Sequence, residues 1–429
     1  MNINFLNSEK MLERAERSIP LGTQTFSKSK TQFPYGASPF YATHGKGSKL
    51  WDVDGNEYID FANSLAAITL GYSDDDINKA VKDQLEKGTI FSLPTELEIE
   101  LSEKICEIIP CAEMVRFGKN GSDATAGAIR VSRAFTGRDH VAVCGYHGWQ
   151  DWYIGSTQRN LGVPESTRNL THNFIYNDIN SLNDIFKKYP GQIACVIMEA
   201  MNIAEPTNSF LYQVQELAKK NGAVFILDET ITGFRYDIGG AQKYFNITPD
   251  LATFGKGMSN GFPISAIAGR PDIMKFFEEV FFSFTFGGET LSIVASLACI
   301  KKYQEQNVTE FLKKQGEKIF NGVDNIIKKN NSENIFELKG HPSWSFFVIK
   351  DFNGYSSFQI KTLFMQEMIS RGIITIGTHN ISYSHNDDDI KKLLTAYEEI
   401  IPIMVDAINK REIEKKVRCE FLKPLFKVR

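Results

Sequence analysis

Short apolar segments rich in β-branched residues alternate with helical patterns through the middle of the chain, and this alternation constrains the fold more than any other feature. Continuous apolar strands separated by helices are typical of a largely parallel sheet that is covered on both faces. Ligands of such sheets bind at the carboxyl ends of the strands. The strand-like segments are EMVRF (113–117), HVAVC (140–144), IACVIME (193–199), AVFILDE (223–229), LATF (251–254) and ISAIAG (264–269).

The two ends of the chain have a different pattern. The segment GSKLWDVDGNEYIDF (47–61) has two alternating apolar runs around Asp54-Gly55, which predicts a β-hairpin in a small N-terminal domain. A chain of 429 residues suits one large domain with smaller ones. We therefore expect an N-terminal segment of a small domain at 1–75, a large domain at 76–305 and a C-terminal small α/β domain at 306–429.

Two charged residues follow apolar strands in the central region. Asp228 ends the segment FILD, and Lys256 lies between Gly255 and Gly257 just after LATF. An isolated aspartate in this position is usually a helix cap or a metal ligand, and an isolated lysine is equally often an exposed turn residue. Lysine is strongly hydrated, however, and a place between two glycines at the end of an apolar strand is unusual for it. The pair therefore indicates a functional site at the carboxyl edge of the sheet.

The segment LDETITGFRYDIGGAQKYFNITPDLATFGKGMSNGFPISAIAGRPDIM (227–274) resembles the core signature of class III, fold type I, pyridoxal-phosphate (PLP) aminotransferases, nearest to the glutamate-1-semialdehyde aminomutase-like branch. The resemblance extends over almost the whole chain. It implies an α/β PLP-transferase fold type I, in which a large, mostly parallel seven-stranded sheet has helices on both faces and a small domain is built from both chain ends. It also implies that Lys256 holds PLP as a Schiff base and later shuttles a proton, while Asp228 pairs with the pyridinium nitrogen.

The segment RFGKNGSDATAGAIRVSRAFTGR (116–138) resembles the strand, turn and helix start that bind the cofactor phosphate in this family. Gly121 lets the backbone approach an anion, and Ser122 begins a helix whose free amides face it. A plain helix cap at Ser122 is the alternative interpretation. The resemblance assigns Asn120, Gly121 and Ser122 as phosphate ligands.

Further cofactor contacts follow from the resemblance. Tyr146 matches the aromatic residue that stacks on the pyridine ring, although a structural aromatic is the alternative, and His147 is expected beside it. Thr230 occupies the position of a β-branched apolar residue and keeps a methyl group for packing on the ring. Thr285, in FTFGGETL (284–291), matches a loop that reaches the partner's phosphate, which implies a homodimer with shared active sites.

Substrate residues are less constrained by the sequence. Lys28 stands where aminomutases of this branch have an arginine for the substrate carboxylate, and Glu199 matches a glutamate on the substrate side. Trp149, His379 and Asn380 would add aromatic and polar groups, which suit a sugar or sugar acid. Core packing is the alternative for Trp149, His379 and Asn380, and a buried, paired structural carboxylate is the alternative for Glu199.

The resemblance implies an aminotransferase that takes an amino group from a donor, expected to be glutamate, and passes it to a sugar or sugar-acid carbonyl. The mechanism would be ping-pong through a pyridoxamine phosphate form, and the 8-amino-Kdo type would place it in carbohydrate and lipopolysaccharide biosynthesis. A 2,1-aminomutase is the alternative, but Lys28 and the absence of an acid at 377–380 disfavour it. A non-catalytic protein with the same fold ranks lower. No metal is expected, because His379 and His385 match no metal-ligand spacing.

Composition excludes other functions. The net charge of −4 disfavours a nucleic-acid or anionic-membrane surface, which needs clustered basic residues. The six cysteines contain no CxxC pair and are expected to be reduced. The N-terminus lacks the apolar run of a signal peptide, and no apolar stretch is long enough to span a membrane. We therefore expect a cytoplasmic protein that binds small molecules and no nucleic acid or membrane.

Overall fold

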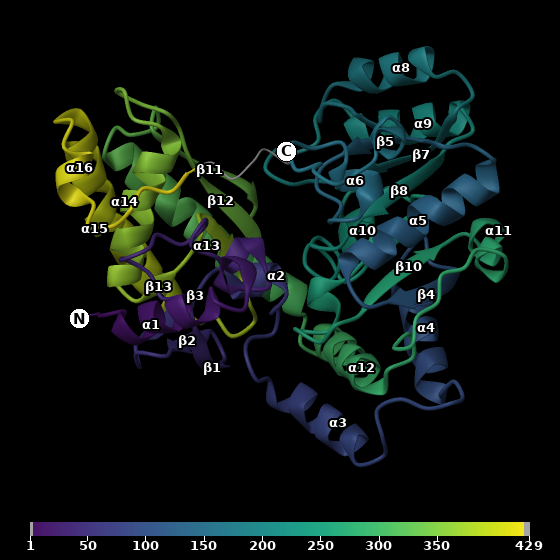
Figure 1. The fold of residues 1–429 in the computed structure, drawn as a ribbon, viewed down its shortest axis with the longest axis horizontal. Coiled ribbons are helices and arrows are strands. Elements are labelled where there is room, and N and C mark those ends of the chain that lie inside the picture. Colours follow the sequence, from purple (N-terminus) through teal and green to yellow (C-terminus); the bar gives the residue numbers. More distant parts are fainter. Residues whose placement is uncertain (1–2, 424–429) are drawn as a thin grey trace. The chain divides into compact units, whose positions relative to one another are not determined.

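The computed structural model describes residues 3–423, which form two compact units. The larger unit spans Asp75–Glu310, and the second combines residues 3–74 with residues 311–423. Figure 1 shows the elements of both units along the chain.

A seven-stranded sheet forms the centre of the larger unit, in the order β4-β10-β9-β8-β7-β5-β6. Strand β10 runs antiparallel to both of its neighbours, and the other pairs are parallel. The predicted fold type I sheet is therefore confirmed. The strands are β4 (Met114–Gly118), β5 (His140–Cys144), β6 (Thr171–Asn173), β7 (Ile193–Met198), β8 (Val224–Asp228), β9 (Leu251–Phe254) and β10 (Ser265–Gly269).

The central strands are covered on both faces. Every residue of β7, β8, β9 and β10 is buried, so alternate side chains on both sides of the sheet are shielded from water. Helix α5 (Gly121–Thr136) crosses five strands, from β4 to β7, and α9 (Phe210–Lys220) packs on β8 (Figure 1). This burial explains why the strands read as continuous apolar runs.

Local signals set the ends of the helices that face the sheet. Asn120 and Asp123 form a capping box at the start of α5, and Gly137 ends that helix in the left-handed conformation, with φ of 66°. Gly222 follows α9 with the same φ of 66°. The remaining helices of this unit are α3 (Asp75–Leu85), α4 (Glu96–Ile108), α6 (Asp151–Ile154), α7 (Glu165–Arg168), α8 (Ile179–Lys188), α10 (Gly240–Tyr244), η3 (Lys256–Met258), α11 (Pro271–Met274), η4 (Lys275–Glu278) and α12 (Thr290–Glu305).

The second unit contains two small sheets, β1-β2-β3-β13 and β11-β12-β14. The predicted hairpin is confirmed, because β2 and β3 pair antiparallel on either side of Asp54-Gly55. Helices α14 and α15 pack against each other. The strands are β1 (Ala42–Lys46), β2 (Lys49–Asp52), β3 (Glu57–Asp60), β11 (Phe336–His341), β12 (Trp344–Ile349), β13 (Ile373–Ile374) and β14 (Thr378–Asn380). The helices are α1 (Leu6–Ala15), η1 (Pro20–Gly22), η2 (Phe26–Lys28), α2 (Asn63–Ala66), α13 (Val308–Lys329), α14 (Ser357–Ser370), α15 (Asp387–Asn409) and α16 (Ile413–Lys416).

Between residues 3 and 423, none of the helices combines the length and the apolar character that crossing a lipid bilayer requires.

Candidate active site

Four parallel strands of the larger unit, β5, β7, β8 and β9, end at one edge of the sheet, and polar residues gather there. Asp228 is the last residue of β8 and pairs in register with Thr253 of β9. Lys256 begins the short helix η3 just after β9. Its φ of 42° is a strained conformation for a residue other than glycine. Such strain is found more often at functional sites than elsewhere.

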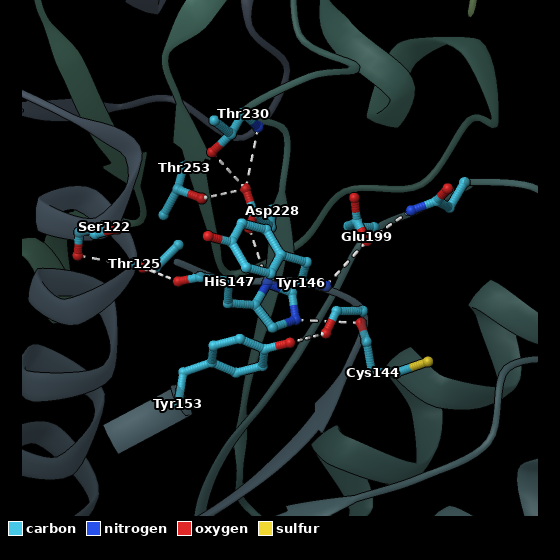
Figure 2. A network of polar contacts seen from close by, with 12 residues as sticks. Ser122, Thr125, Cys144, Tyr146, His147, Tyr153, Glu199, Asp228, Thr230 and Thr253 are labelled. Carbon is cyan, nitrogen blue, oxygen red and sulfur yellow. Dashed lines mark hydrogen bonds and ion pairs between the residues drawn. The ribbon is translucent and has the colours of Figure 1, made fainter. Parts of the chain in front are cut away.

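Asp228 is a buried carboxylate surrounded by donors (Figure 2). One oxygen, Oδ1, accepts hydrogen bonds from the Thr230 amide at 3.0 Å, the Thr230 hydroxyl at 2.6 Å and the Thr253 hydroxyl at 3.1 Å. The other, Oδ2, lies 2.8 Å from Nδ1 of His147. Burial alone would raise the pKa of Asp228, but the His147 ring and the Thr230 donors outweigh it and hold the pKa below its ordinary value. The group is therefore ionised at neutral pH.

His147 connects Asp228 to the end of β5. Its Nδ1 faces the Asp228 carboxylate, and its Nε2 lies 3.1 Å from the carbonyl oxygen of Cys144. Both ring nitrogens therefore lie within hydrogen-bond distance of an oxygen atom. The ring is 1% exposed. His147 thus holds Asp228 from the side opposite to the two threonines.

The turn before α5 offers donors for an anion. The amides of Lys119 and Asn120 already donate to the Asp123 carboxylate, at 3.0 and 3.1 Å, and the Asn120 side chain completes the capping box. The next two amides, of Gly121 and Ser122, have no acceptor among the described residues. They point from the first turn of a helix, where a phosphate is stabilised by free N–H groups and the helix dipole.

The space beside Gly121 is shaped for close approach. A Cβ atom at this position would lie 2.9 Å from the Thr230 methyl carbon. Thr230 therefore fills the gap between Asp228, to which it donates, and the first turn of α5. A carboxylate for a ring nitrogen, a lysine and two free helix amides fit the demands of PLP, which needs an imine partner, a pyridinium partner and a phosphate site.

Tyr146 and Glu199 lie at the outer side of the same edge. The Tyr146 amide donates to Glu199 Oε2 at 3.1 Å (Figure 2). Tyr146 is 37% exposed. Asn202 also donates to Glu199 Oε2, at 3.0 Å. Trp149 is exposed, and its amide donates to the Ser122 hydroxyl at 3.2 Å. This hydrogen bond connects the segment after Tyr146 to the first turn of α5.

Other residues that the sequence singled out lie elsewhere. Thr285 is exposed in the loop 281–289 of the larger unit. In the second unit, Lys28 is exposed in η2. His379 is fully buried there, with Nδ1 2.9 Å from Ser345 Oγ and Nε2 2.9 Å from the Tyr397 hydroxyl, which leaves neither nitrogen for a ligand. Asn380 is buried and donates to the Ala62 carbonyl at 2.6 Å.

The sequence interpretation missed two polar partners of the site. Thr253 is fully buried within the apolar segment LATF, and a hydroxyl in such a strand beside the strand of Asp228 was the available signal. Asn202 follows β7 and holds Glu199, and no local pattern indicates this contact. Within residues 3–423, no three His, Cys, Asp or Glu side chains gather in a way that could hold a metal ion.

The fold and the site define a PLP-dependent enzyme of fold type I, and comparison with known proteins identifies its family. The model of the family "Aminotransferase class-III" matches residues 32–401. The chain therefore belongs to the class III aminotransferases, and PLP is its cofactor.

Three relatives illustrate the match. The 3-aminobutyryl-CoA aminotransferase of Cloacimonas acidaminovorans is 34% identical over 407 residues, which cover 92% of this chain and 97% of the relative. The glutamate-1-semialdehyde 2,1-aminomutase of Persephonella marina is 32% identical over 417 residues, covering 91% and 97%. The structure of the PLP internal aldimine form of the FumI protein of Sphingopyxis sp. MTA144 has a TM-score of 0.86, 26% identity, and covers 94% of this chain and 98% of that chain.

Proposed function

We propose that this aminotransferase works by a ping-pong mechanism, in which glutamate gives up its amino group and a separate carbonyl acceptor receives it. The observation that carries the proposal is the ionised Asp228 carboxylate, held by four donors at the end of the strand next to the one that leads to Lys256. Burying a carboxylate is unfavourable unless it is paired, and a cationic ring nitrogen facing Asp228 would provide this pairing.

In this proposal Lys256 and Asp228 are the catalytic residues, and the Gly121 and Ser122 amides hold the phosphate. Asn120 acts mainly through the capping box that aims them. Tyr146 would pack on the cofactor ring, and the Thr230 methyl would add an apolar contact to it. Bound PLP supplies an electron sink for charge that develops at the substrate α-carbon.

The chain's own residues would then divide the work. Asp228 keeps a proton on the ring nitrogen, because its charge is stabilised by His147 and the two threonines. The Lys256 amine, once free, moves a proton on the substrate side of the site. Glu199, fixed by Asn202 and the Tyr146 amide, presents a carboxylate toward the substrate.

The acceptor is the least constrained part of the function. A cavity of about 500 Å³ adjoins Glu199, and it is lined mostly by apolar surface from residues such as Phe174, Ile175 and Ile203. Its lining residues, all within the described range, include no Lys or Arg. The names of the relatives above contain an acyl-CoA amine and glutamate 1-semialdehyde, not a sugar. We therefore propose a carbonyl acceptor with an apolar part that this cavity can hold, and retain the sugar or sugar-acid class as one arm of a substrate panel.

An aminomutase is the second candidate, because relatives with that activity in their names match over nearly the whole chain. Against it, Lys28 is an exposed point donor and lacks the two-pronged geometry of arginine. The two functions differ in a simple assay. An aminomutase converts glutamate 1-semialdehyde without any donor or acceptor, whereas an aminotransferase releases at most one 2-oxoglutarate per site from glutamate until an acceptor is added.

The Lys256→Ala variant tests the proposal directly. We expect it to lose the visible absorbance of the lysine-bound cofactor, at roughly 410–430 nm, and all multiple-turnover transamination, because no other residue forms the imine. The fold should survive, which circular dichroism can check. Lys275→Ala, on the short helix η4, serves as the control that keeps both signals. Full activity in Lys256→Ala would contradict the proposal.

A further inference from the structure

Lys119 and Glu289 form an ion pair between two segments of the larger unit. Lys119 begins the turn that leads into α5 (residues 119–122, called the phosphate turn below), and Glu289 directly precedes α12. Lys119 Nζ lies 3.1 Å from Glu289 Oε2, and the two side chains are only 18% and 16% exposed. Both residues belong to the larger unit. Neither side chain has a role in the site described above, and an ion pair this far from water is not a typical surface pair.

The Glu289 end of this pair is firmly held. Its Oε1 accepts the Leu291 amide at 2.6 Å, and its Oε2 accepts the Ser292 amide at 3.2 Å and the Ser292 hydroxyl at 2.6 Å. Burial would raise the pKa of Glu289, but Ser292, Lys119 and the Leu291 amide together hold it below its ordinary value. The carboxylate is therefore a charged cap of α12 that cannot swing away without uncapping the helix.

The start of α12 is also fastened to the chain before α4. The Thr290 amide donates to the Thr89 carbonyl at 2.9 Å, and the Thr290 hydroxyl lies 3.0 Å from the Gly88 carbonyl. Thr290 is fully buried. Glu289 thus offers Lys119 a fixed anchor outside α5.

At the other end of the pair, Lys119 directly precedes the segment whose amides are assigned to the phosphate. Its amide donates to the Asp123 carboxylate, so the backbone is tied to α5 on one side, while its ammonium is tied to α12 on the other. The Gly121 and Ser122 amides follow within three residues. A rotation of this short turn would redirect both amides together.

We propose that the Lys119–Glu289 ion pair is a positioning device that fixes the phosphate turn against α12 and so sets the affinity for PLP. The inference rests on the proposed function, because it takes the turn to be the phosphate site. In this arrangement the Glu289 carboxylate strengthens PLP binding although it is an anion near the phosphate, because it holds Lys119 and the turn in place.

If only the charges of the two side chains acted on the phosphate, Glu289 would weaken PLP binding. If Lys119 acted only as a positive charge near the phosphate, loss of the Glu289 charge would strengthen PLP binding, and Lys119 would act independently of Glu289. In the positioning role, loss of either partner removes the whole contribution of the ion pair to PLP binding. The second substitution then has no further effect. Glu289→Gln separates the two, because the amide oxygen can still cap α12.

The experiment measures the PLP dissociation constant and release rate of the full-length protein for the wild type, Lys119→Met, Glu289→Gln, the double variant and Lys119→Arg. We expect each single variant to bind PLP roughly 5- to 20-fold more weakly, the double variant to be no worse than either, and Lys119→Arg to restore most of the affinity. Lys301→Met removes an exposed ion pair on α12 itself and should leave PLP binding unchanged. Melting of the PLP-free protein monitors the fold.

Three outcomes would overturn the inference: tighter or unchanged binding in Glu289→Gln, additive effects in the double variant, or an equal loss in Lys301→Met. A wild-type protein that binds no PLP would remove the proposed function and this inference together. If the wild type binds PLP and Glu289→Gln binds it equally well, the inference is wrong and the proposed function stands.

Discussion

The chemistry of single residues explains how Asp228 keeps its charge inside the protein. Moving a carboxylate out of water costs several kcal/mol unless donors replace the lost hydration. Three hydrogen bonds to Oδ1 and the His147 contact to Oδ2 provide this replacement. The site is therefore ready to hold a cationic ring nitrogen without rearrangement, which is the condition for electrostatic catalysis.

Asp228→Asn should lower kcat/KM by roughly a hundredfold or more, because a neutral amide cannot stabilise a protonated ring nitrogen. Steady-state kinetics with glutamate and the best acceptor of the panel would measure this loss. Asp272→Asn, which changes a half-exposed aspartate paired with Arg270, is the matched control and should stay close to the wild type. Near-normal kinetics in Asp228→Asn would place the essential carboxylate elsewhere.

The lowered pKa of Asp228 also predicts a pH dependence of stability. A carboxyl group whose pKa is lower in the folded than in the unfolded protein stabilises the fold above the unfolded value, and this contribution disappears as the pH falls through the folded value. The ordinary value is 3.8, so the loss should occur below about pH 4. Denaturant unfolding of the PLP-free protein at several pH values should show the difference between the wild type and Asp228→Asn shrinking in this range. A constant difference would contradict the ionised state.

At the scale of elements, the sequence predicted what local patterns encode. The apolar segments predicted the sheet, and Asp54-Gly55 predicted the hairpin. Strand β10 was not distinguishable from its parallel neighbours, because burial on both faces produces the same apolar run in either direction. The contact between His147 and Asp228 joins two strands far apart in the chain, and no local pattern encodes it.

Helix α2 shows a second limit of sequence interpretation. Its four residues, Asn63 to Ala66, all have positive φ, from 42° to 68°, and none is glycine. Such a turn costs roughly 1–2 kcal/mol per residue. The amides of Ala62 and Asn63 donate to the Asp60 carboxylate, at 2.7 and 3.0 Å, and the Asn63 side chain donates to the Asn380 carbonyl. Contacts over more than 300 residues therefore select a conformation that these residues disfavour by themselves.

The first turn of α5 supports a prediction of its own. Gly121→Ala should weaken PLP binding roughly tenfold or more, because the added methyl would lie 2.9 Å from the Thr230 methyl carbon and push the turn out of place. The PLP-free protein should lose little stability, since alanine is favoured over glycine in a helix. Equilibrium titration with PLP would measure the effect.

The control for this prediction is a compensating change. Thr230→Ser keeps the hydroxyl that donates to Asp228 and removes the methyl that the new side chain meets. Gly121→Ala combined with Thr230→Ser should therefore recover part of the PLP affinity. If the double variant is weaker than Gly121→Ala alone, steric crowding is not the cause.

At the scale of the whole molecule, the exposed side chains of the loop 281–289 have no assigned role inside their own chain, unlike Glu289 at its end. It exposes Thr285 and two large apolar side chains, Phe281 at 80% and Phe286 at 57%. Two large apolar groups exposed on one short loop indicate an interaction surface. We propose that this loop docks on a second copy of the chain and that Thr285 donates to the phosphate bound there, so that each active site uses residues from two chains.

Mixing two defective variants would test this arrangement. In a dimer of Lys256→Ala with Thr285→Ala, one site carries both defects, while the other combines an intact Lys256 with an intact Thr285. Random exchange of subunits should thus yield about a quarter of all sites intact. Activity at limiting PLP should rise well above that of either variant alone, in proportion to the mixed dimer isolated by affinity tags. If Thr285 served its own chain, every site in the mixture would keep a defect and mixing would restore nothing.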